Sequence, residues 1–235
     1  MPRPKGLLFD KDGTLIDFDR TWGPAARLVM SELAAGDEAA FDRLARVSLF
    51  DPIADRFERT SPLVAGSSAG FGGLWADALG RADGPDFHAE IDRLFLHHGF
   101  ASLAPIGNPA EVLGALAGMG LRLGIATNDS EVSARRQSEV LGLSDMIEFV
   151  AGYDTGHGAK PEPGMVLAFV GALGYAPDEV MMIGDSTHDL HAARAAGAIA
   201  VAVLSGPAPH DELAPHADHV IGTIAELPEL VRRYA

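Results

Sequence analysis

Cysteine is absent from this chain of 235 residues, so thiol catalysis is excluded and no disulfide supports the fold. No run approaches 18 uninterrupted apolar residues, which predicts that no helix spans a membrane. The N-terminal residues 1–5 lead straight into a short apolar run, without the hydrophobic region and cleavage site of a signal peptide. We therefore expect a cytoplasmic protein without a membrane partner.

Basic residues are also scarce, with 18 Lys and Arg against 33 Asp and Glu and a formal net charge of −15. Such a charge repels phosphate backbones, so nucleic acid is not an expected partner. Small phosphorylated metabolites remain possible ligands, because local cations override a global field at short range. The composition leaves open whether the protein is a monomer or a homodimer.

The remaining composition is that of an ordinary globular protein, with 47% hydrophobic and 22% charged residues. A chain of this length can bury a substantial core without support from a metal or a disulfide. It can form one large domain, or a core with a smaller insertion.

From residue 105 onward, short apolar runs alternate with amphipathic stretches, a pattern typical of repeated βα units and a parallel sheet. We predict strands at 121–126, 147–151, 180–183, 199–204 and 219–221. We predict helices at 109–118, 130–141, 163–173 and 187–196, and a last helix from about residue 223. Glycines close several of these helices, among them Gly174 and Gly197.

Between residues 18 and 104 the pattern changes, because helical spacing dominates and no clear strand interrupts it. We interpret 18–104 as a helical insertion and 1–17 with 105–235 as one α/β core, since the first strand needs the later strands to bury both of its faces. Within the insertion, 65–73 is rich in Gly and Ser and is expected to be flexible. It is either a mobile specificity loop or a plain connection.

The apolar run 7–9 ends in two carboxylates spaced one residue apart, Asp10 and Asp12. In a strand, such side chains point to the same side, and Gly13 permits a tight turn after them. Carboxylates this close repel each other, unless a cation is bound or one of them keeps its proton. The segment predicts chemistry at the tip of a strand, with an acidic turn after an edge strand as the alternative.

Polar groups follow two later strands in the same way. Thr127 and Asn128 come after the strand at 121–126, and Asp185 and Asp189 after the strand at 180–183. Ligands of open α/β sheets bind outside the carboxyl ends of the strands, so these segments are expected to converge. Lys160, one of only three lysines in the chain, precedes a predicted helix.

In order and in strand context, these segments resemble the four motifs of the haloacid dehalogenase (HAD) superfamily. The matching residues are Asp10-x-Asp12-Gly13-Thr14, Thr127-Asn128, Lys160-Pro161 and Gly184-Asp185-Ser186-x-x-Asp189. The helical insertion is similar to the helical cap of the family, so the resemblance covers the whole chain. It implies an α/β fold, with a Rossmann-like parallel sheet core and an inserted α-helical cap. Within the family, the chain looks most like the phosphoglycolate phosphatase branch.

The resemblance implies an Mg²⁺-dependent phosphatase that hydrolyses a small phosphorylated metabolite, phosphoglycolate-like, through an aspartyl-phosphate. Asp10 carries over as the nucleophile, and Asp12 as the general acid and then the general base. Thr127 and Lys160 carry over as groups that hold phosphoryl oxygens during catalysis, and Asn128 as a further substrate-binding residue.

The resemblance also implies a metal site. Asp10, the backbone carbonyl of Asp12, and Asp185 carry over as Mg²⁺ ligands, and an oxygen-only set suits this ion. Asp189 carries over as the residue that positions a metal-bound water or Lys160. Asp189 would also complement the dipole of a helix at its first turn.

Substrate choice is less constrained. Many close relatives carry Ser after the aspartate at position 17, where this chain has Phe18. Arg20, at the start of the insertion, is either a contact for a substrate carboxylate or a surface residue.

Other reactions of the same scaffold are partly excluded. Phosphonate hydrolysis needs a cap lysine, and no lysine lies between Lys11 and Lys160. Dehalogenases lack the second aspartate, which argues against them. A sugar phosphomutase uses the same two aspartates and stays open, as does a catalytically idle phosphate-binding module.

Overall fold

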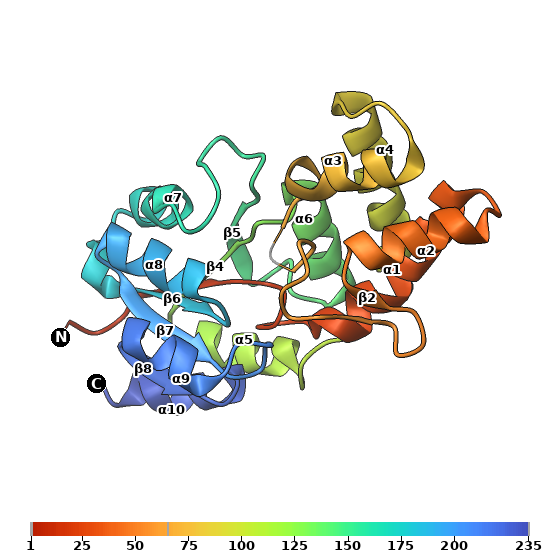
Figure 1. Cartoon of the computed structure of the whole chain (residues 1–235). Helices are drawn as coiled ribbons and strands as arrows, with labels where there is room; N and C mark the ends of the chain where they lie inside the picture. Colours follow the sequence, from red (N-terminus) through yellow and green to blue (C-terminus); the bar gives the residue numbers. More distant parts are fainter. Residues whose placement is uncertain (1, 65, 235) are drawn as a thin grey trace. The chain divides into compact units, whose positions relative to one another are not determined.

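A computed structural model describes residues 2–64 and 66–234 of the chain (Figure 1). They form two compact units, of which the first comprises Met1–Asp17 with Pro105–Ala235 and the second Phe18–Ala104. The first unit is therefore discontinuous in sequence. In the sequence, the second unit is inserted between the first two strands of the first unit.

Six parallel strands form the sheet of the first unit, in the order β5-β4-β1-β6-β7-β8. They are β1 (Gly6–Phe9), β4 (Arg122–Ala126), β5 (Ile147–Ala151), β6 (Val180–Gly184), β7 (Ile199–Val203) and β8 (His219–Ile221). Every residue of β1, β6 and β7 is buried, as in parallel sheets with both faces covered. The predicted α/β fold with a parallel sheet is confirmed.

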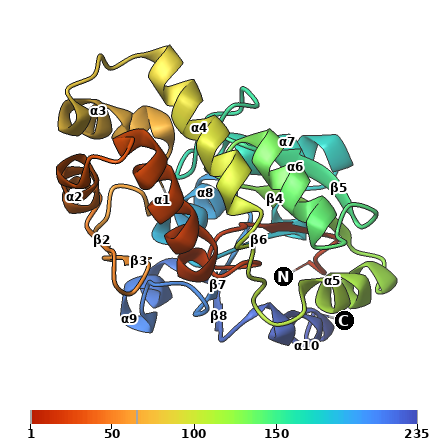
Figure 2. The ribbon, with the colours of Figure 1, turned by 90° about the vertical axis from the view of Figure 1, so that its right-hand side faces the viewer.

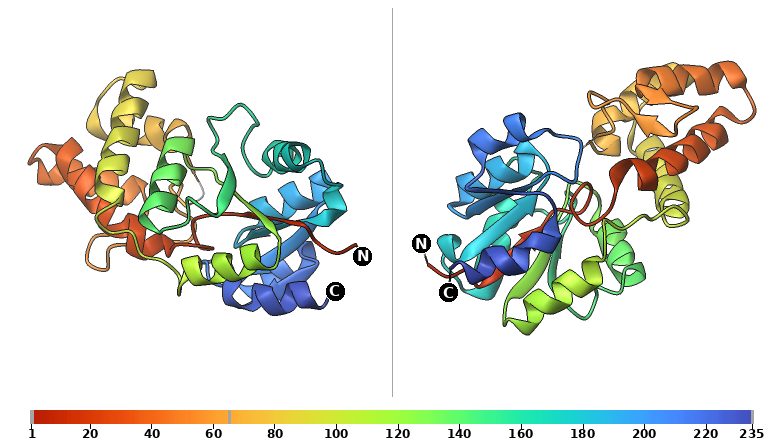
Figure 3. Two further views of the ribbon diagram at one scale, coloured as in Figure 1. Left: turned by 180° about the vertical axis from the view of Figure 1, so that it is seen from behind. Right: turned by 90° about the horizontal axis from the view of Figure 1, so that it is seen from below.

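Helices cover both faces of this sheet (Figures 2 and 3). They are α5 (Pro109–Gly118), α6 (Glu131–Val140), α7 (Gly164–Leu173), α8 (Thr187–Ala196), α9 (His210–Leu213) and α10 (Leu227–Arg232), with short 3₁₀ helices η1 (Pro177–Glu179), η2 (Ala214–His216) and η3 (Ile224–Glu226). Helices α7 and α8 contact each other and share a buried cluster with Leu8, Met182 and Ala200 of the sheet. Helices α5 and α10 pack together on the opposite face.

Local sequence explains where these helices begin and end. The side chain of Asn108 accepts a hydrogen bond from the Glu111 amide ahead of α5, and Ser130 accepts one from the Ser133 amide ahead of α6. Gly174 and Gly197 follow α7 and α8 in the left-handed conformation that glycine adopts without strain. Short α9, after β7, is an element that the sequence analysis did not predict.

Strand order reverses direction at β1, which lies between β4 and β6. Loops on its two sides therefore diverge at the carboxyl end of β1, the place where open α/β sheets bind ligands. The segments that follow β1, β4 and β6 begin at this point. They contain Asp10, Thr127 and Asp185.

The second unit consists mainly of four helices, α1 (Phe18–Ala34), α2 (Glu38–Val47), α3 (Ser68–Leu79) and α4 (Pro85–Gly99). Its own apolar core surrounds the fully buried Trp75, whose indole Nε1 donates to Ser48 Oγ at 2.8 Å. The expectation of no strand is wrong here. Residues Phe50–Asp51 (β2) and Arg56–Phe57 (β3) pair as a short antiparallel ribbon, which is too brief to give a period-2 signal.

The expectation that 65–73 is a flexible segment also needs correction. Residues 68–73 belong to α3, and Phe71 is buried in the core of the second unit. Tertiary burial overrides the poor helix propensity of this glycine-rich sequence. Residue 65 of that segment lies outside the described residues.

Among the described helices, none combines the length and the apolar character that crossing a bilayer requires.

Candidate active site

Side chains from four loops meet beyond the carboxyl ends of β1, β4, β5 and β6. Lys160, in the loop after β5, is the centre of this group, and its side chain is only 3% exposed. Its Nζ donates to Asp10 Oδ1 at 2.5 Å, to Asp189 Oδ1 at 2.6 Å and to the carbonyl oxygen of Ala126 at 2.9 Å. The ammonium group thus connects the segment after β1 to helix α8 and to the end of β4.

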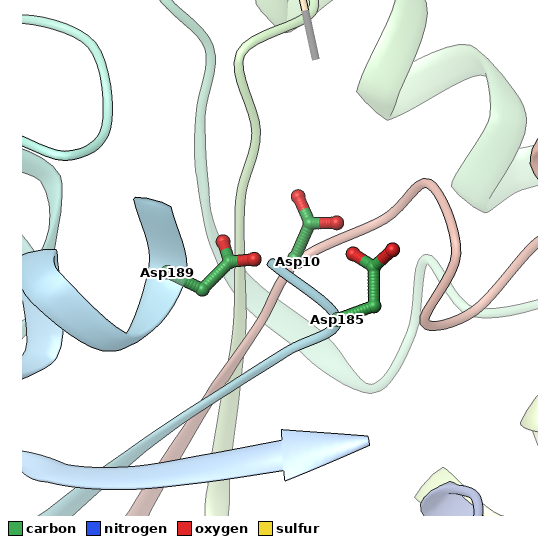
Figure 4. Close-up of side chains that lie close together, drawn as sticks. All are labelled: Asp10, Asp185 and Asp189. Carbon is green, nitrogen blue, oxygen red and sulfur yellow. The ribbon is translucent and has the colours of Figure 1, made fainter. Parts of the chain in front are cut away.

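Three carboxylates gather around this ammonium group. Asp10, Asp185 and Asp189 are all buried, and each offers an oxygen within 4.8 Å of the others. Figure 4 shows their side chains converging, Asp189 from α8 and the other two from just beyond β1 and β6. A group of carboxylate oxygens is the kind of ligand set that a hard divalent cation such as Mg²⁺ prefers.

Burial dominates the protonation of this cluster. It raises the pKa of Asp10 to about 7, against the attraction of Lys160 and with the repulsion of Asp189 and Asp12. Burial likewise raises the pKa of Asp185 well above its ordinary value, and the charges of Asp10 and Asp189 add to it. The pKa of Lys160 is raised, because the attraction of Asp10 and Asp189 outweighs the burial that would lower it. A divalent cation would offset both the burial of these carboxylates and the repulsion between them.

Asn128 fixes the backbone position of Lys160. Its Oδ1 accepts from the backbone amide of Lys160 and its Nδ2 donates to the backbone carbonyl of Lys160, both at 2.9 Å. One side-chain amide therefore pairs with both polar groups of the Lys160 backbone. This fastens the loop after β5 to the loop after β4.

Asp189 has two structural partners besides its place in the cluster. Its Oδ2 accepts from Ser186 Oγ at 2.6 Å and from the Ser186 amide at 3.2 Å, across the first turn of α8. Its Oδ1 accepts from Lys160. Both oxygens are thus engaged by hydrogen-bond donors, so helix capping and a role in the cluster coexist in this residue.

Two glycines make room for Asp185. Gly13 has a φ of +78°, and a Cβ there would lie 2.2 Å from Asp185 Oδ2. A Cβ at Gly206, in the loop after β7, would lie 1.8 Å from the same oxygen. Ser205 Oγ donates to the carbonyl oxygen of Gly13 at 2.7 Å, so this loop closes against the first motif.

The sequence analysis missed Ser205 and Gly206. The sequence contained a signal for them, because they follow the strand at 199–203 as a polar, glycine-containing segment, as the other site residues follow their strands.

Asp12 forms an ion pair with a second buried lysine, Lys11. Lys11 Nζ lies 2.6 Å from Asp12 Oδ2 and 3.1 Å from Asp129 Oδ2, and its side chain is 2% exposed. Two carboxylates therefore occupy the first motif, and each contacts a different ammonium group. The sequence analysis assigned no role to Lys11.

Thr127 is buried directly after β4. Its amide donates to the carbonyl of Ala151, and its Oγ1 accepts from the Asp129 amide at 3.0 Å. Arg20 belongs to the second unit, where it is exposed in the first turn of α1.

Two comparisons with known proteins give the same family. The family model of the haloacid dehalogenase-like hydrolases matches residues 4–197. A Rhodospirillum rubrum protein named phosphoglycolate phosphatase is 36% identical over 210 residues, which cover 86% of this chain and 80% of that protein.

Solved structures share the fold. A HAD family hydrolase from Deinococcus radiodurans, determined with bound phosphate and sodium, has a TM-score of 0.69 at 22% identity and covers 100% of this chain and 97% of its own. A beta-phosphoglucomutase from Clostridium difficile also has a TM-score of 0.69, at 15% identity, over 98% of each chain. At such identities the likeness concerns the fold alone.

Proposed function

Because the chain belongs to the haloacid dehalogenase-like hydrolases and is a phosphatase of that family, we propose that it hydrolyses a small phosphorylated metabolite with Mg²⁺ as cofactor. The observation that carries the proposal is the group of Asp10, Asp185, Asp189 and Lys160 at the reversal of strand order. It combines a buried nucleophile, an oxygen-only metal set and a fixed cation in one place. Asp10 is the proposed nucleophile, through an aspartyl-phosphate.

In the first step, a carboxylate oxygen of Asp10 attacks phosphorus and forms an acyl phosphate bond, while the ester P–O bond breaks. The leaving alcohol oxygen takes a proton from the carboxyl group of Asp12. Asp12 follows Asp10 by two residues, in a turn that Gly13 permits. Both groups thus belong to one short loop, which limits their relative motion.

In the second step, water attacks the phosphorus of the aspartyl-phosphate, and the ionised Asp12 accepts a proton from that water. The acyl phosphate P–O bond breaks, which releases inorganic phosphate and restores the Asp10 carboxylate. Asp12 is protonated again and ready for the next ester. Every proton that Asp12 gives in the first step is thereby recovered in the second.

Phosphoryl oxygens need donors that are already in place as charge moves. Lys160 supplies a fixed positive charge, because its three N–H groups are held by two carboxylates and a carbonyl, and it attracts the phosphoryl oxygens through that charge. Thr127 supplies a hydroxyl, because an oxygen that accepts from the Asp129 amide still carries its own proton to donate. We assign Asn128 to positioning Lys160, since its side-chain amide pairs with both polar groups of the Lys160 backbone.

The residues fit Mg²⁺, because the donors are all oxygens and glycines at 13 and 206 keep space beside Asp185. Asp10, Asp185 and the backbone carbonyl of Asp12 would hold the ion. Asp189 would act from outside this set, since both of its oxygens already accept hydrogen bonds. When bound, the ion neutralises charge on the transferred phosphoryl group.

For the substrate, we propose a phosphoglycolate-like ester, which bears a carboxylate next to the phosphate. The support is the 36% identity to the Rhodospirillum rubrum protein of that name. Arg20 is the proposed partner for the substrate carboxylate, as a charged donor in the inserted unit. The inserted unit, 18–104, then serves as the specificity cap of the core formed by 1–17 and 105–235.

The test is release of inorganic phosphate from a panel of phosphorylated metabolites, with Mg²⁺ and with chelator. We expect phosphoglycolate among the best substrates, and no release with chelator until Mg²⁺ is restored. Transfer of phosphate to a sugar hydroxyl in place of water would identify a mutase. Absence of any turnover would leave a phosphate-binding module and overturn the proposal.

A further inference from the structure

Lys11 is a buried lysine that the proposed mechanism does not use. It lies between Asp10 and Asp12 in sequence, and its side chain is 2% exposed. Lysines are almost never buried unless they are paired. Its partners, Asp12 at 2.6 Å and Asp129 at 3.1 Å, come from segments more than a hundred residues apart in the chain. The ammonium group therefore bridges the loop after β1 and the loop after β4.

Asp129 is a rigid anchor for this bridge. Its Oδ1 accepts from the Ser130 amide at 2.7 Å, and its own amide donates to Thr127 Oγ1 at 3.0 Å. Its carbonyl oxygen accepts from the Tyr153 amide at 3.1 Å. Four polar atoms of Asp129 are thus engaged once Oδ2 binds Lys11. A side chain fixed in this way can hold the ammonium group at one position.

Asp12 is more exposed than the other carboxylates of the first and fourth motifs, with 21% of its side chain accessible. An exposed carboxylate on a loop samples several rotamers unless a partner selects one. Lys160 does not fix the rotamer of Asp12, because its ammonium group is bound to Asp10, Asp189 and Ala126. Lys11 is the ammonium group that contacts Asp12, through a short charged interaction.

We propose that Lys11 is a positioning residue, whose ammonium group holds the Asp12 carboxyl where it gives a proton to the leaving alcohol and takes one from water. This inference rests on the proposed function. The proton moves between Asp12 and the substrate only, and Lys11 keeps its three protons throughout.

Leaving-group dependence separates this role from a merely structural one. An alkyl phosphate needs a proton on its leaving oxygen, whereas p-nitrophenyl phosphate releases a stable phenolate without one. The kcat/KM value reports the steps through release of the alcohol, so it isolates the first proton transfer from the later hydrolysis. A misplaced Asp12 lowers kcat/KM for the alkyl ester selectively. A damaged fold lowers both values together.

The experiment measures kcat/KM for phosphoglycolate and for p-nitrophenyl phosphate at saturating Mg²⁺, in wild type and Lys11→Met. We expect the ratio of the two values to fall by ~10-fold or more, a part of the ~10² to 10⁴ that general acid catalysis contributes. Lys5→Met is the matched control, because it removes an ion-paired lysine at the other end of β1, where Lys5 Nζ lies 2.7 Å from Glu179. It is expected to leave the ratio unchanged.

Asp129→Asn tests the same bridge without removing the buried lysine, so it also serves if Lys11→Met does not fold. Asparagine keeps an oxygen for the Ser130 amide but loses the charge that Lys11 contacts. We expect a smaller fall of the ratio, of ~3-fold or more.

A ratio that stays constant or rises in both variants would overturn the assignment of Lys11, even with wild-type turnover intact. Wild-type protein that hydrolyses neither ester would instead overturn the proposed function. The two failures are therefore distinguishable.

Discussion

At the scale of single residues, the candidate site contains fewer ammonium groups than carboxylates. The chain has three lysines, and two of them, Lys11 and Lys160, are buried beside the carboxylates of the first and fourth motifs. Five carboxylates, those of residues 10, 12, 129, 185 and 189, share these two ammonium groups. The site is thus electrostatically incomplete without a cation, which is what a metal-assisted reaction requires.

Replacing Asp10 by Asn tests the nucleophile. The amide keeps the shape of the side chain but cannot form the acyl phosphate, so kcat is expected to fall by at least ~10³. Mass spectrometry of trapped wild-type protein is expected to place one added phosphoryl group on the peptide containing Asp10. A variant that retains a tenth of wild-type turnover would contradict this assignment.

The raised pKa of Asp10 gives the metal-free protein a pH-dependent stability. The Asp10 carboxyl holds its proton up to a pKa of about 7 in the folded protein, whereas in the unfolded chain it releases the proton near the ordinary aspartate pKa of 3.8. Between these values the folded state binds more protons, so stability falls as pH rises. We expect the Tm in chelator to fall by several degrees from pH 5 to pH 8. Asp10→Asn is expected to show a shallower fall, because the variant loses the contribution of Asp10, while Asp185, with its pKa raised in the same direction, remains.

At the scale of helices, strands and loops, much was predictable from the sequence. Strands β5 and β8 and helix α8 were predicted with the observed bounds, because periodicity and flanking glycines specify such elements. The ribbon of β2 and β3 and the helical start of α3 were not predictable, because tertiary packing in the second unit decides them. Site loops were predictable as strand tips, but which side chains pair across them was not. The bond of Lys160 to Asp10 joins residues 150 positions apart.

The loop after β7 offers a prediction at this scale. In Gly206→Ala the new Cβ would lie 1.8 Å from Asp185 Oδ2 and 2.6 Å from Asp185 Cβ, so the carboxylate and the loop segment beside it would both have to shift. We expect the apparent affinity for Mg²⁺ to fall by ~10-fold or more, toward the value of Asp185→Ala. Gly171→Ala, on helix α7 with open space around its Cβ position, is the control and is expected to bind Mg²⁺ as wild type does. Equal metal titrations for Gly206→Ala and wild type would show that Asp185 is not a ligand.

At the scale of the whole molecule, chemistry and substrate choice are assigned to different units. All residues proposed for phosphoryl transfer lie in the first unit, whereas Arg20 lies in the second. Each unit has its own buried cluster, one around Phe169 and the other around Trp75. Mutations in the second unit are therefore expected to change specificity without changing the reaction.

Arg20→Ala tests this division. If Arg20 binds the substrate carboxylate, KM for phosphoglycolate is expected to rise by ~10-fold or more, the contribution of one charged hydrogen bond. Hydrolysis of p-nitrophenyl phosphate, which lacks the carboxylate, is expected to stay nearly unchanged. Arg46→Ala, an exposed arginine on α2 of the same unit, is the matched control. If activity fell equally on both substrates, Arg20 would support the fold instead of binding the carboxylate. If activity fell on neither substrate, Arg20 would be a surface residue without a role in binding.

The insertion after the first strand also has a consequence for synthesis on the ribosome. β1 is a central, fully buried strand, yet Leu7 pairs with Leu123 on one side and with Met181 on the other. The second partner is translated about 170 residues after the first strand, roughly 10 to 35 s later at about 5 to 20 residues per second. During that time the inserted unit has its whole sequence available, whereas the apolar segment Leu7–Phe9 has strand partners on one side at most. The nascent chain therefore exposes one edge of a fully buried strand until β6 is made, so correct pairing of β1 has to wait for the second half of synthesis.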